Sequence, residues 1–129
     1  MTTGLLRTSG GQRHSSETPT SGTWIEHAHV SASDAAAGDY FGSAVGISGE
    51  TMVVGAPYDY NVGGVAAGSA YVYTRSGSSW TQQQQLMASV GIANSYFGTS
   101  VAVSGDTIIV GATNSAHIFT RDGSVWTQQ

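Results

Sequence analysis

The chain has 129 residues with 18 glycines and no cysteine, and only 9% of its side chains are charged. Its net charge is −4, with only four Lys and Arg residues against eight Asp and Glu residues. Nucleic-acid phosphates and anionic lipids bind to basic surfaces, so we expect neither nucleic acid nor a membrane as a partner. Without cysteine there is no disulfide and no thiol site, and the length suits one domain at most.

Residues 1–23 are polar, rich in Gly, Ser and Thr, and unrelated to the rest of the chain. This composition predicts a flexible polar tail. The tail also lacks the apolar centre of a signal peptide. The next stretch, residues 24–33, predicts an outer strand of a sheet whose other three strands are not found upstream.

The stretch Phe41–Pro57 returns at Phe97–Thr113 after a constant offset of 56 residues (97 − 41). Over Phe41–Ala56 and Phe97–Ala112, 9 of 16 positions are identical, and repetition on this scale sets the architecture. Each copy predicts two strands joined by a tight turn in which glycine supplies the positive φ. In the first strand, large apolar side chains alternate with small ones, which is the period of a strand. The second strand is continuously apolar, which is typical of a strand covered on both faces.

The repeat continues into a third strand and an outer strand, which return after an offset of 46 residues. The second copy has therefore lost ten residues in one connection, which marks that connection as a surface loop. Within the first copy the four strands are expected at 42–48, 51–56, 69–75 and 80–88. A four-stranded unit that cannot cover its own faces predicts a β-propeller blade. The predicted fold class is all-β, with about two blades of four-stranded antiparallel sheet in the chain.

Phe41–Gly42 followed by Gly55–Pro57 resembles the FG-GAP repeat, the blade of integrin α-subunit propellers and of many bacterial secreted proteins. Phe97–Gly98 with Gly111–Ala112 is similar, with Thr113 where the family has proline. The resemblance implies a non-enzymatic module for adhesion or ligand binding, and it suggests an extracellular or cell-surface location.

The resemblance covers residues 24–129 and implies blades at 41–88 and 97–129, preceded by the outer strand at 24–33. A propeller needs about 4–8 blades. Two explanations stay open. Several copies assemble head to tail into one ring and exchange their outer strands, or the chain is part of a longer propeller. A two-blade monomer would leave sheet edges and apolar faces open.

Many members of this family carry a calcium loop between the FG and GAP elements. Here that connection is reduced to Ser48–Thr51 and Ser104–Thr107, with one carboxylate each. Calcium needs several oxygen ligands from one loop, so we expect no metal and no cofactor. The stretch Asp59–Gly63 is similar to the start of a calcium loop but lacks the later acidic ligand. His27 and His29 share one strand face without a third ligand, which favours a solvated surface.

In a blade, the loop before the first strand and the loop between the second and third strands emerge on one face of the ring. In integrin-like propellers this face binds partners. Carboxylates beside tyrosines suit a ligand with hydroxyl or cationic groups, such as a glycan or a protein. The alternative is that these residues only form the turns of their loops. The candidate ligand-binding residues are Asp34, Asp39, Tyr40, Tyr58, Asp59, Tyr60 and Asn61.

The sequence contains no nucleophile elbow, phosphate loop or dinucleotide fingerprint, so we do not expect an enzyme. The first hypothesis is a binding module that recognises a ligand through the loops of one ring face. The second is a self-assembling propeller, or a propeller fragment, with no ligand of its own.

Overall fold

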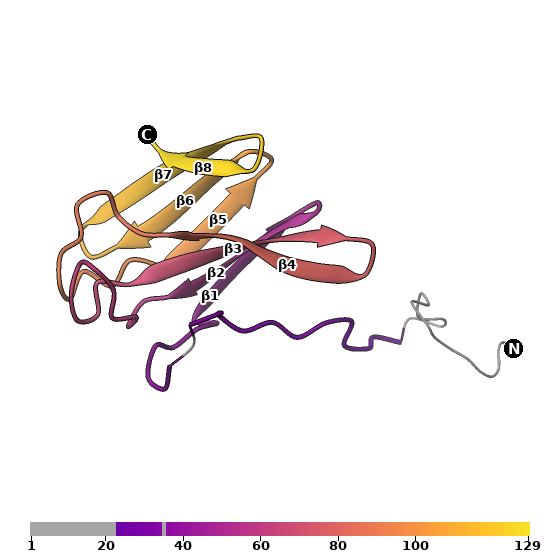
Figure 1. Cartoon of the computed structure of the whole chain (residues 1–129), viewed down its shortest axis with the longest axis horizontal. Helices are drawn as coiled ribbons and strands as arrows, with labels where there is room; N and C mark the ends of the chain where they lie inside the picture. The colour runs from indigo at the N-terminus through magenta and orange to yellow at the C-terminus, as the bar shows by residue number, and fades with distance from the viewer. Residues whose placement is uncertain (1–22, 35) are drawn as a thin grey trace, which may run out of the picture.

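The computed structural model describes residues 23–34 and 36–129. Within these residues eight β-strands form two four-stranded antiparallel sheets, which confirms the all-β prediction (Figure 1). The predicted flexible tail, residues 1–23, lies outside the described residues except for Thr23. In the described part of the chain, no helix is long and apolar enough to cross a membrane.

The first sheet, which we call blade 1, joins its strands in the order β1-β2-β3-β4. These strands are β1 (Ala44–Ser48), β2 (Thr51–Ala56), β3 (Ser69–Ser76) and β4 (Ser79–Leu86). They coincide with the four strands predicted from the repeat to within two residues at each end. A register shift between Val72 and Tyr73 marks a β-bulge where β3 pairs with β4, and such a bulge bends the outer half of a sheet.

The second sheet, blade 2, repeats this arrangement in the order β5-β6-β7-β8. Its strands are β5 (Ser100–Ser104), β6 (Thr107–Ala112), β7 (Ser115–Asp122) and β8 (Val125–Gln128). The inner hairpins have the same register, with Val45 opposite Val54 in blade 1 and Val101 opposite Val110 in blade 2. The sequence repeat is therefore a structural repeat.

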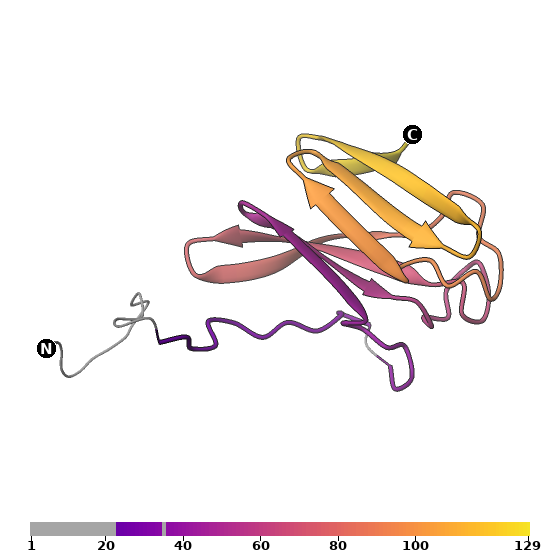
Figure 2. The ribbon, with the colours of Figure 1, turned by 180° about the vertical axis from the view of Figure 1, so that it is seen from behind.

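Residues 24–33, predicted as an outer strand, form no strand within the described residues. They run beside blade 1 in both views of the ribbon (Figures 1 and 2). The hydroxyl of Tyr73 donates to the carbonyl of Ser31 at 2.9 Å, and the amide of Ser33 donates to Gln82 Oε1 at 3.2 Å. A strand needs the backbone groups of a neighbouring strand, and no described residue offers them to this segment.

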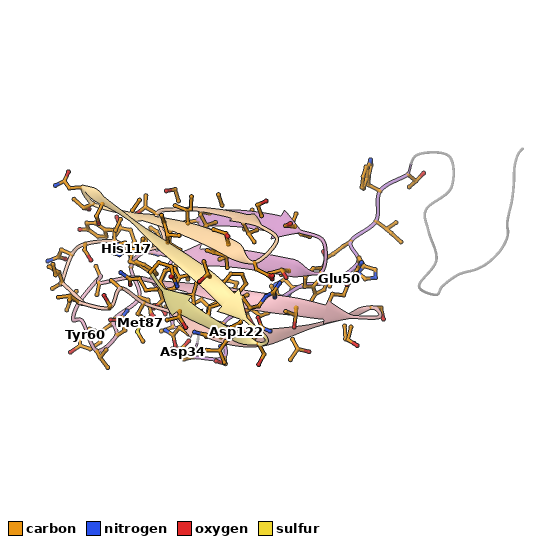
Figure 3. All side chains as sticks on the ribbon, turned by 90° about the horizontal axis from the view of Figure 1, so that it is seen from above. Asp34, Glu50, Tyr60, Met87, His117 and Asp122 are labelled. Carbon is orange, nitrogen blue, oxygen red and sulfur yellow. The ribbon has the colours of Figure 1, made fainter. Side chains whose placement is uncertain are left out.

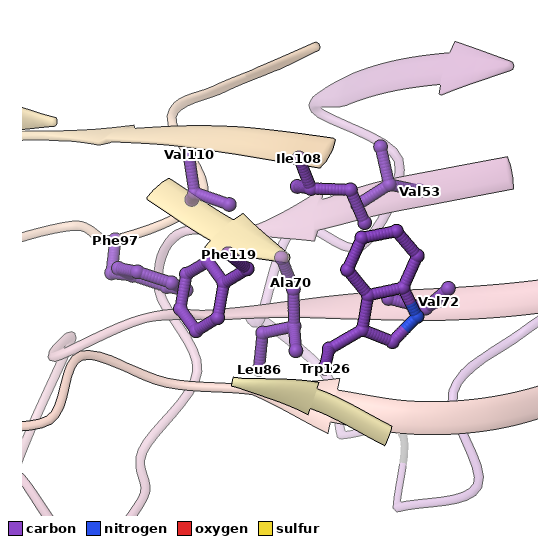
Figure 4. Packing of buried hydrophobic residues seen from close by; sticks show 9 residues of the cluster. All are labelled: Val53, Ala70, Val72, Leu86, Phe97, Ile108, Val110, Phe119 and Trp126. Atoms are coloured by element: carbon purple, nitrogen blue, oxygen red, sulfur yellow. The ribbon is translucent and has the colours of Figure 1, made fainter. Parts of the chain in front are cut away.

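The main core lies between the two sheets (Figure 4). We call the side of each sheet that carries Val53 in blade 1 or Ile109 in blade 2 its back face, and the opposite side its front face. The back face of blade 1 packs against the front face of blade 2, and Val53 is fully buried there. The cluster consists of Val53, Ala70, Val72, Leu86, Phe97, Ile108, Val110, Phe119 and Trp126.

Glycine lets the two blades approach backbone to backbone at the end where the loops lie. A Cβ atom on Gly55 would overlap the carbonyl oxygen of Gly98. The Gly of the GAP element in blade 1 therefore packs on the Gly of the FG element in blade 2. Gly68, with φ of 89°, lies equally close to the backbone of Phe97.

The long connection between β2 and β3 is tied to the loop that leads into blade 2. The amides of Asn94, Tyr96 and Phe97 donate to the carbonyls of Val65, Ala66 and Ala67 at 2.8, 3.0 and 2.9 Å. We call this set of three backbone hydrogen bonds the loop clasp. It fixes the loops of the two blades relative to each other.

Candidate functional site

The loops expected on one ring face do gather at one end of the blades. Figure 3 shows Tyr60 at this end and Glu50 at the opposite end, where the tight turns lie. The amide of Tyr58 donates to the carbonyl of Asp39 at 3.2 Å, which joins the loop before β1 to the loop after β2. The prediction that these two loops share one end of the blade is thus met.

Three tyrosines form an aromatic row at the loop end. The ring centroids of Tyr40 and Tyr58 lie 4.6 Å apart, and those of Tyr58 and Tyr96 lie 5.1 Å apart. Tyr40 is 60% exposed and Tyr58 is 47% exposed, while Tyr96 is half-buried. We call Tyr40, Tyr58 and Tyr96 the tyrosine row. Its members come from three loops and from both blades.

The two outer tyrosines of the row share an unusual backbone conformation. Tyr40 has φ of 61° and Tyr96 has φ of 56°. Residues other than glycine rarely adopt a positive φ, because this backbone conformation costs conformational energy. Each closes a turn, because its carbonyl accepts the amide of Ser43 or of Thr99 at 3.1 Å. Both stand directly before a Phe-Gly pair. The same backbone turn therefore recurs at both tyrosines.

Asp59 lies inside blade 1 and not on the loop surface, because only 3% of it is exposed. Its Oδ2 accepts a hydrogen bond from Ser69 Oγ at 2.6 Å and one from Gln85 Nε2 at 3.2 Å. Burial raises the pKa of this carboxyl, and the hydrogen bond from Ser69 partly opposes that shift. Asp59 therefore stabilises the loop from within, and we remove it from the candidate binding surface.

Tyr71 connects this buried carboxyl to the surface. Its hydroxyl donates to Asp34 Oδ1 at 2.8 Å and lies 3.3 Å from Asp59 Oδ2. Burial, followed by the hydrogen bond to Asp34, raises the pKa of Tyr71 well above its usual range. Asp34 itself is exposed, so one candidate carboxylate is fixed at the surface by a buried phenol.

The remaining candidates divide between loop structure and surface. Asp39 is half-buried, and its Oδ2 accepts the amide of Ala36 at 3.2 Å. Asn61 shapes its own loop, with Oδ1 accepting the amide of Gly63 at 2.8 Å and Nδ2 donating to the carbonyl of Gly68 at 2.7 Å. Tyr60 is 72% exposed and lies outside the tyrosine row.

Tyr96 was absent from the predicted site although a signal for it was present. The offset of 56 residues maps Tyr40 onto Tyr96, so the tyrosine is repeated where the acidic residues are not. The contact through Tyr58 could not be read from the repeat, because it depends on how the long loop folds back over the neighbouring blade.

The tight turns at the opposite end do not fit calcium. The single carboxylate of each turn is bound by an arginine, with Arg75 Nε 2.9 Å from Glu50 and Arg121 Nη2 2.8 Å from Asp106. The hydrogen bond and charge of Arg75 lower the pKa of Glu50. Over residues 23–34 and 36–129, no group of three or more His, Cys, Asp or Glu side chains could hold a metal ion.

Two segments match the sequence model of a family described as FG-GAP repeat, residues 24–73 and 80–127. Each matched unit begins at a tryptophan, Trp24 or Trp80, and continues into the following blade, ending within β3 in the first unit and within β8 in the second. The unit therefore pairs one outer segment with the blade that comes after it. No curated protein matches the chain.

Proposed function

Because the chain belongs to the FG-GAP repeat family, we propose that it is a non-enzymatic interaction module that recognises a ligand through the loops at one end of its blades. The observation that carries the proposal is the tyrosine row at the loop end, in which the ring centroids of neighbouring tyrosines lie 4.6 and 5.1 Å apart. Exposed aromatic rings in a row provide a broad apolar surface with polar hydroxyl tips.

A glycan is the ligand class that suits this surface. The apolar face of a sugar ring stacks on aromatic side chains, and sugar hydroxyls donate to carboxylates such as those of Asp34 and Asp39. These two acids lie in the loop that ends at Tyr40. Recognition of glycans on other surfaces would agree with the adhesive, extracellular role that the family resemblance suggests.

The second candidate is a structural module without a ligand. It is favoured by the engagement of Asp39, Asp59 and Asn61 in hydrogen bonds within their own loops. A binding experiment separates the two candidates, because only the first requires the tyrosine row to contact another molecule.

The test is binding of the full chain to a printed array of neutral and acidic oligosaccharides. We expect binding to at least one class of glycan, and we expect Tyr58→Ala to weaken it tenfold or more, a loss of about 1.4 kcal/mol. Tyr60→Ala is the matched control, since it removes an exposed tyrosine from the same loop but outside the row.

Both variants are first compared with the unchanged chain in thermal unfolding, so that loss of binding is not loss of fold. If no glycan binds, or if Tyr58→Ala and Tyr60→Ala bind equally well, the tyrosine row is not a glycan site and the structural candidate stands.

A further inference from the structure

Two sheet faces of the molecule carry large exposed apolar side chains. On the back face of blade 2, Ile109 is 43% exposed, Ile118 45% and Val125 56%. On the front face of blade 1, Val45 is 66% exposed and Ile47 is 64% exposed. These faces lie at the two ends of the stack of sheets.

The sequence repeat relates the residues of each open face to residues of the interface between blades 1 and 2. Ile109 and Ile118 are the counterparts of Val53 and Val72, both 0% exposed in the core between the blades. The front face behaves in the same way. Val45 and Ile47 are the counterparts of Val101 and Val103, which pack on that core from blade 2. The two open faces are thus the two halves of an interface that the chain already makes once within itself.

We propose that a second copy of this chain docks head to tail, with the back face of its blade 2 on the front face of blade 1. The internal interface is the template for this contact. The interface is heterologous, because two different faces meet, so repeated addition closes a ring when the rotation fits. Three or four copies would supply about six to eight blades, within the range of known propellers.

Polar contacts of the template have counterparts that are unused within one chain. Arg121 Nη1 donates to Thr51 Oγ1 at 3.2 Å across the internal interface. The counterparts are Arg75 and Thr107, which lie on the two open faces. The side chain of Arg121 is 17% exposed, whereas that of Arg75 is 37% exposed. Docking therefore places Arg75 of one copy against Thr107 of the second copy.

The close backbone contact between two glycines in the internal interface also has counterparts on both open faces. Gly98 and Gly55, which pack backbone to backbone, correspond to Gly42 and Gly111. A Cβ atom on Gly42 would meet nothing within 4 Å, and the three atoms nearest to one on Gly111 all belong to Ser100. The space that a docked blade requires is therefore open at Gly42, and at Gly111 it opens when the Ser100 hydroxyl rotates away.

Residues 24–33 lie on blade 1 at the position where an outer strand of the docked blade 2 is expected. The amide of Ser89 donates to Gln128 Oε1 at 2.8 Å where the outer strand of blade 1 passes blade 2. The amide of Ser33 makes the corresponding contact with Gln82 Oε1 at 3.2 Å. The segment thus lies on blade 1 as β4 and its continuation lie on blade 2, although no strand of the described residues pairs with it.

The missing sheet partner is β7 of the second copy. In blade 1, Ala70 pairs with Leu86, and the repeat makes Ala116 and Val30 the counterparts of these two residues. Pairing between β7 and β8 reaches only Phe119, so the outer edge of β7 from Ser115 to His117 has no strand partner among the described residues. Val30 of one copy would lie opposite Ala116 of the second.

A hollow of about 450 Å³ lies beside this segment on the front face of blade 1. Its lining includes Ile47, Met52 and Trp80. In the template, the counterpart of Trp80 is Trp126, which packs in one cluster with Val53 and Val72. Ile109 and Ile118 of the second copy are the side chains that fill the hollow.

The first experiment is the native mass of the full chain by light scattering during size exclusion, over a wide range of concentrations. We expect one discrete species of three or four copies. Gly111→Ala adds a methyl group at the docking joint and is expected to weaken association at least tenfold while the chain stays folded. Val62→Ala, at a loop residue that is 96% exposed, is the matched control.

A monomer at every concentration overturns the proposal, as does a two-copy complex with twofold symmetry. A broad distribution of masses that Gly111→Ala leaves unchanged also overturns it, because that behaviour is unspecific aggregation. Circular dichroism of Gly111→Ala checks its fold. If that variant unfolds, the second experiment decides by itself.

The second experiment uses cysteine, which the chain lacks. A Cβ on Gly46 would lie 3.5 Å from Val103 Cγ1 in the template, and the counterparts across copies are Ala102 and Ile47. We expect an Ile47→Cys chain mixed with an Ala102→Cys chain to form a disulfide-linked pair under mild oxidation. Efficient linking of Ile47→Cys to itself, with no mixed product, would show a face-to-face contact and overturn the head-to-tail arrangement.

Discussion

Asp59 is a buried acid that carries a structural role at the loop end. Two donors, Ser69 Oγ and Gln85 Nε2, reach its Oδ2 atom, and the Tyr71 hydroxyl lies 3.3 Å from the same atom. Burial nonetheless raises the pKa of this carboxyl above the ordinary value of 3.8. The folded protein therefore holds the proton more tightly than the unfolded chain does, and folding is favoured most when Asp59 is protonated.

We expect Asp59→Ala to lower the free energy of unfolding by about 1–3 kcal/mol, because it leaves buried donors without an acceptor. Asp59→Asn keeps one oxygen for these donors and cannot ionise. Its stability relative to the unchanged chain should therefore rise as the pH increases from below 3.8, through the raised pKa of the folded state, to neutrality. Urea unfolding followed by circular dichroism, at several pH values, measures both effects.

Asp122→Ala, at an exposed acid, is the control and should change stability little. Equal stability of Asp59→Ala and the unchanged chain would contradict the structural role. A pH dependence of the opposite sign for Asp59→Asn would show that the pKa of Asp59 is lowered in the folded state.

The sequence identified the residues of the loop end but not which of them face outward. Asp34 and Asp59 carry the same side chain in neighbouring loops, yet one is exposed and the other is buried. The difference arises because Asp59 turns back onto its own blade, where its carboxylate meets side chains of β3 and β4, namely Ser69, Tyr71 and Gln85. Contacts between distant segments decide burial here, and local sequence does not encode them.

At the scale of the elements, the strands were predictable because two signals agreed. Side-chain alternation located β1, and the repeat located the same strand again as β5. The segment at 24–33 resembles an outer strand in sequence but forms none here, since a strand exists only beside another strand. Prediction fails at this segment because its partner is not among the described residues.

The paired glycines Gly55 and Gly111 offer a comparison at one repeat position. An added methyl group on Gly55 would overlap the backbone of Gly98, whereas one on Gly111 would meet the hydroxyl of Ser100, a side chain that can rotate away. We expect Gly55→Ala to lower the free energy of unfolding by about 1–3 kcal/mol or more. Gly111→Ala should cost much less in the separated chain. Chemical denaturation of both variants, under conditions where the chains are dissociated, measures the difference.

Neither glycine is in the left-handed region, so backbone strain does not distinguish the two variants. Equal destabilisation by Gly55→Ala and Gly111→Ala would show that the backbone contact between the blades is looser than the structure describes.

At the scale of the whole molecule, the two sheets share one core and should unfold together. Trp126 of blade 2 is 3% exposed among side chains of blade 1, so its fluorescence reports separation of the blades. In a chain carrying Trp24→Phe and Trp80→Phe, we expect the fluorescence and far-ultraviolet circular dichroism transitions to coincide in urea. Loss of the fluorescence signal at lower urea concentration than the sheet signal would show that the blades separate before they unfold.

The loop clasp gives the molecule a mechanical asymmetry. Blade 1 reaches over blade 2 with the long connection from residue 57 to 68, while blade 2 has only Thr113 and Asn114 between β6 and β7. The joint between blades 1 and 2 is therefore stiff, whereas a joint made on the back face of blade 2 lacks such a clasp and is compliant. In a ring of copies, stiff and compliant joints would alternate. Bending, opening and exchange of copies would then concentrate at the compliant joints, with each pair of blades moving as one rigid body.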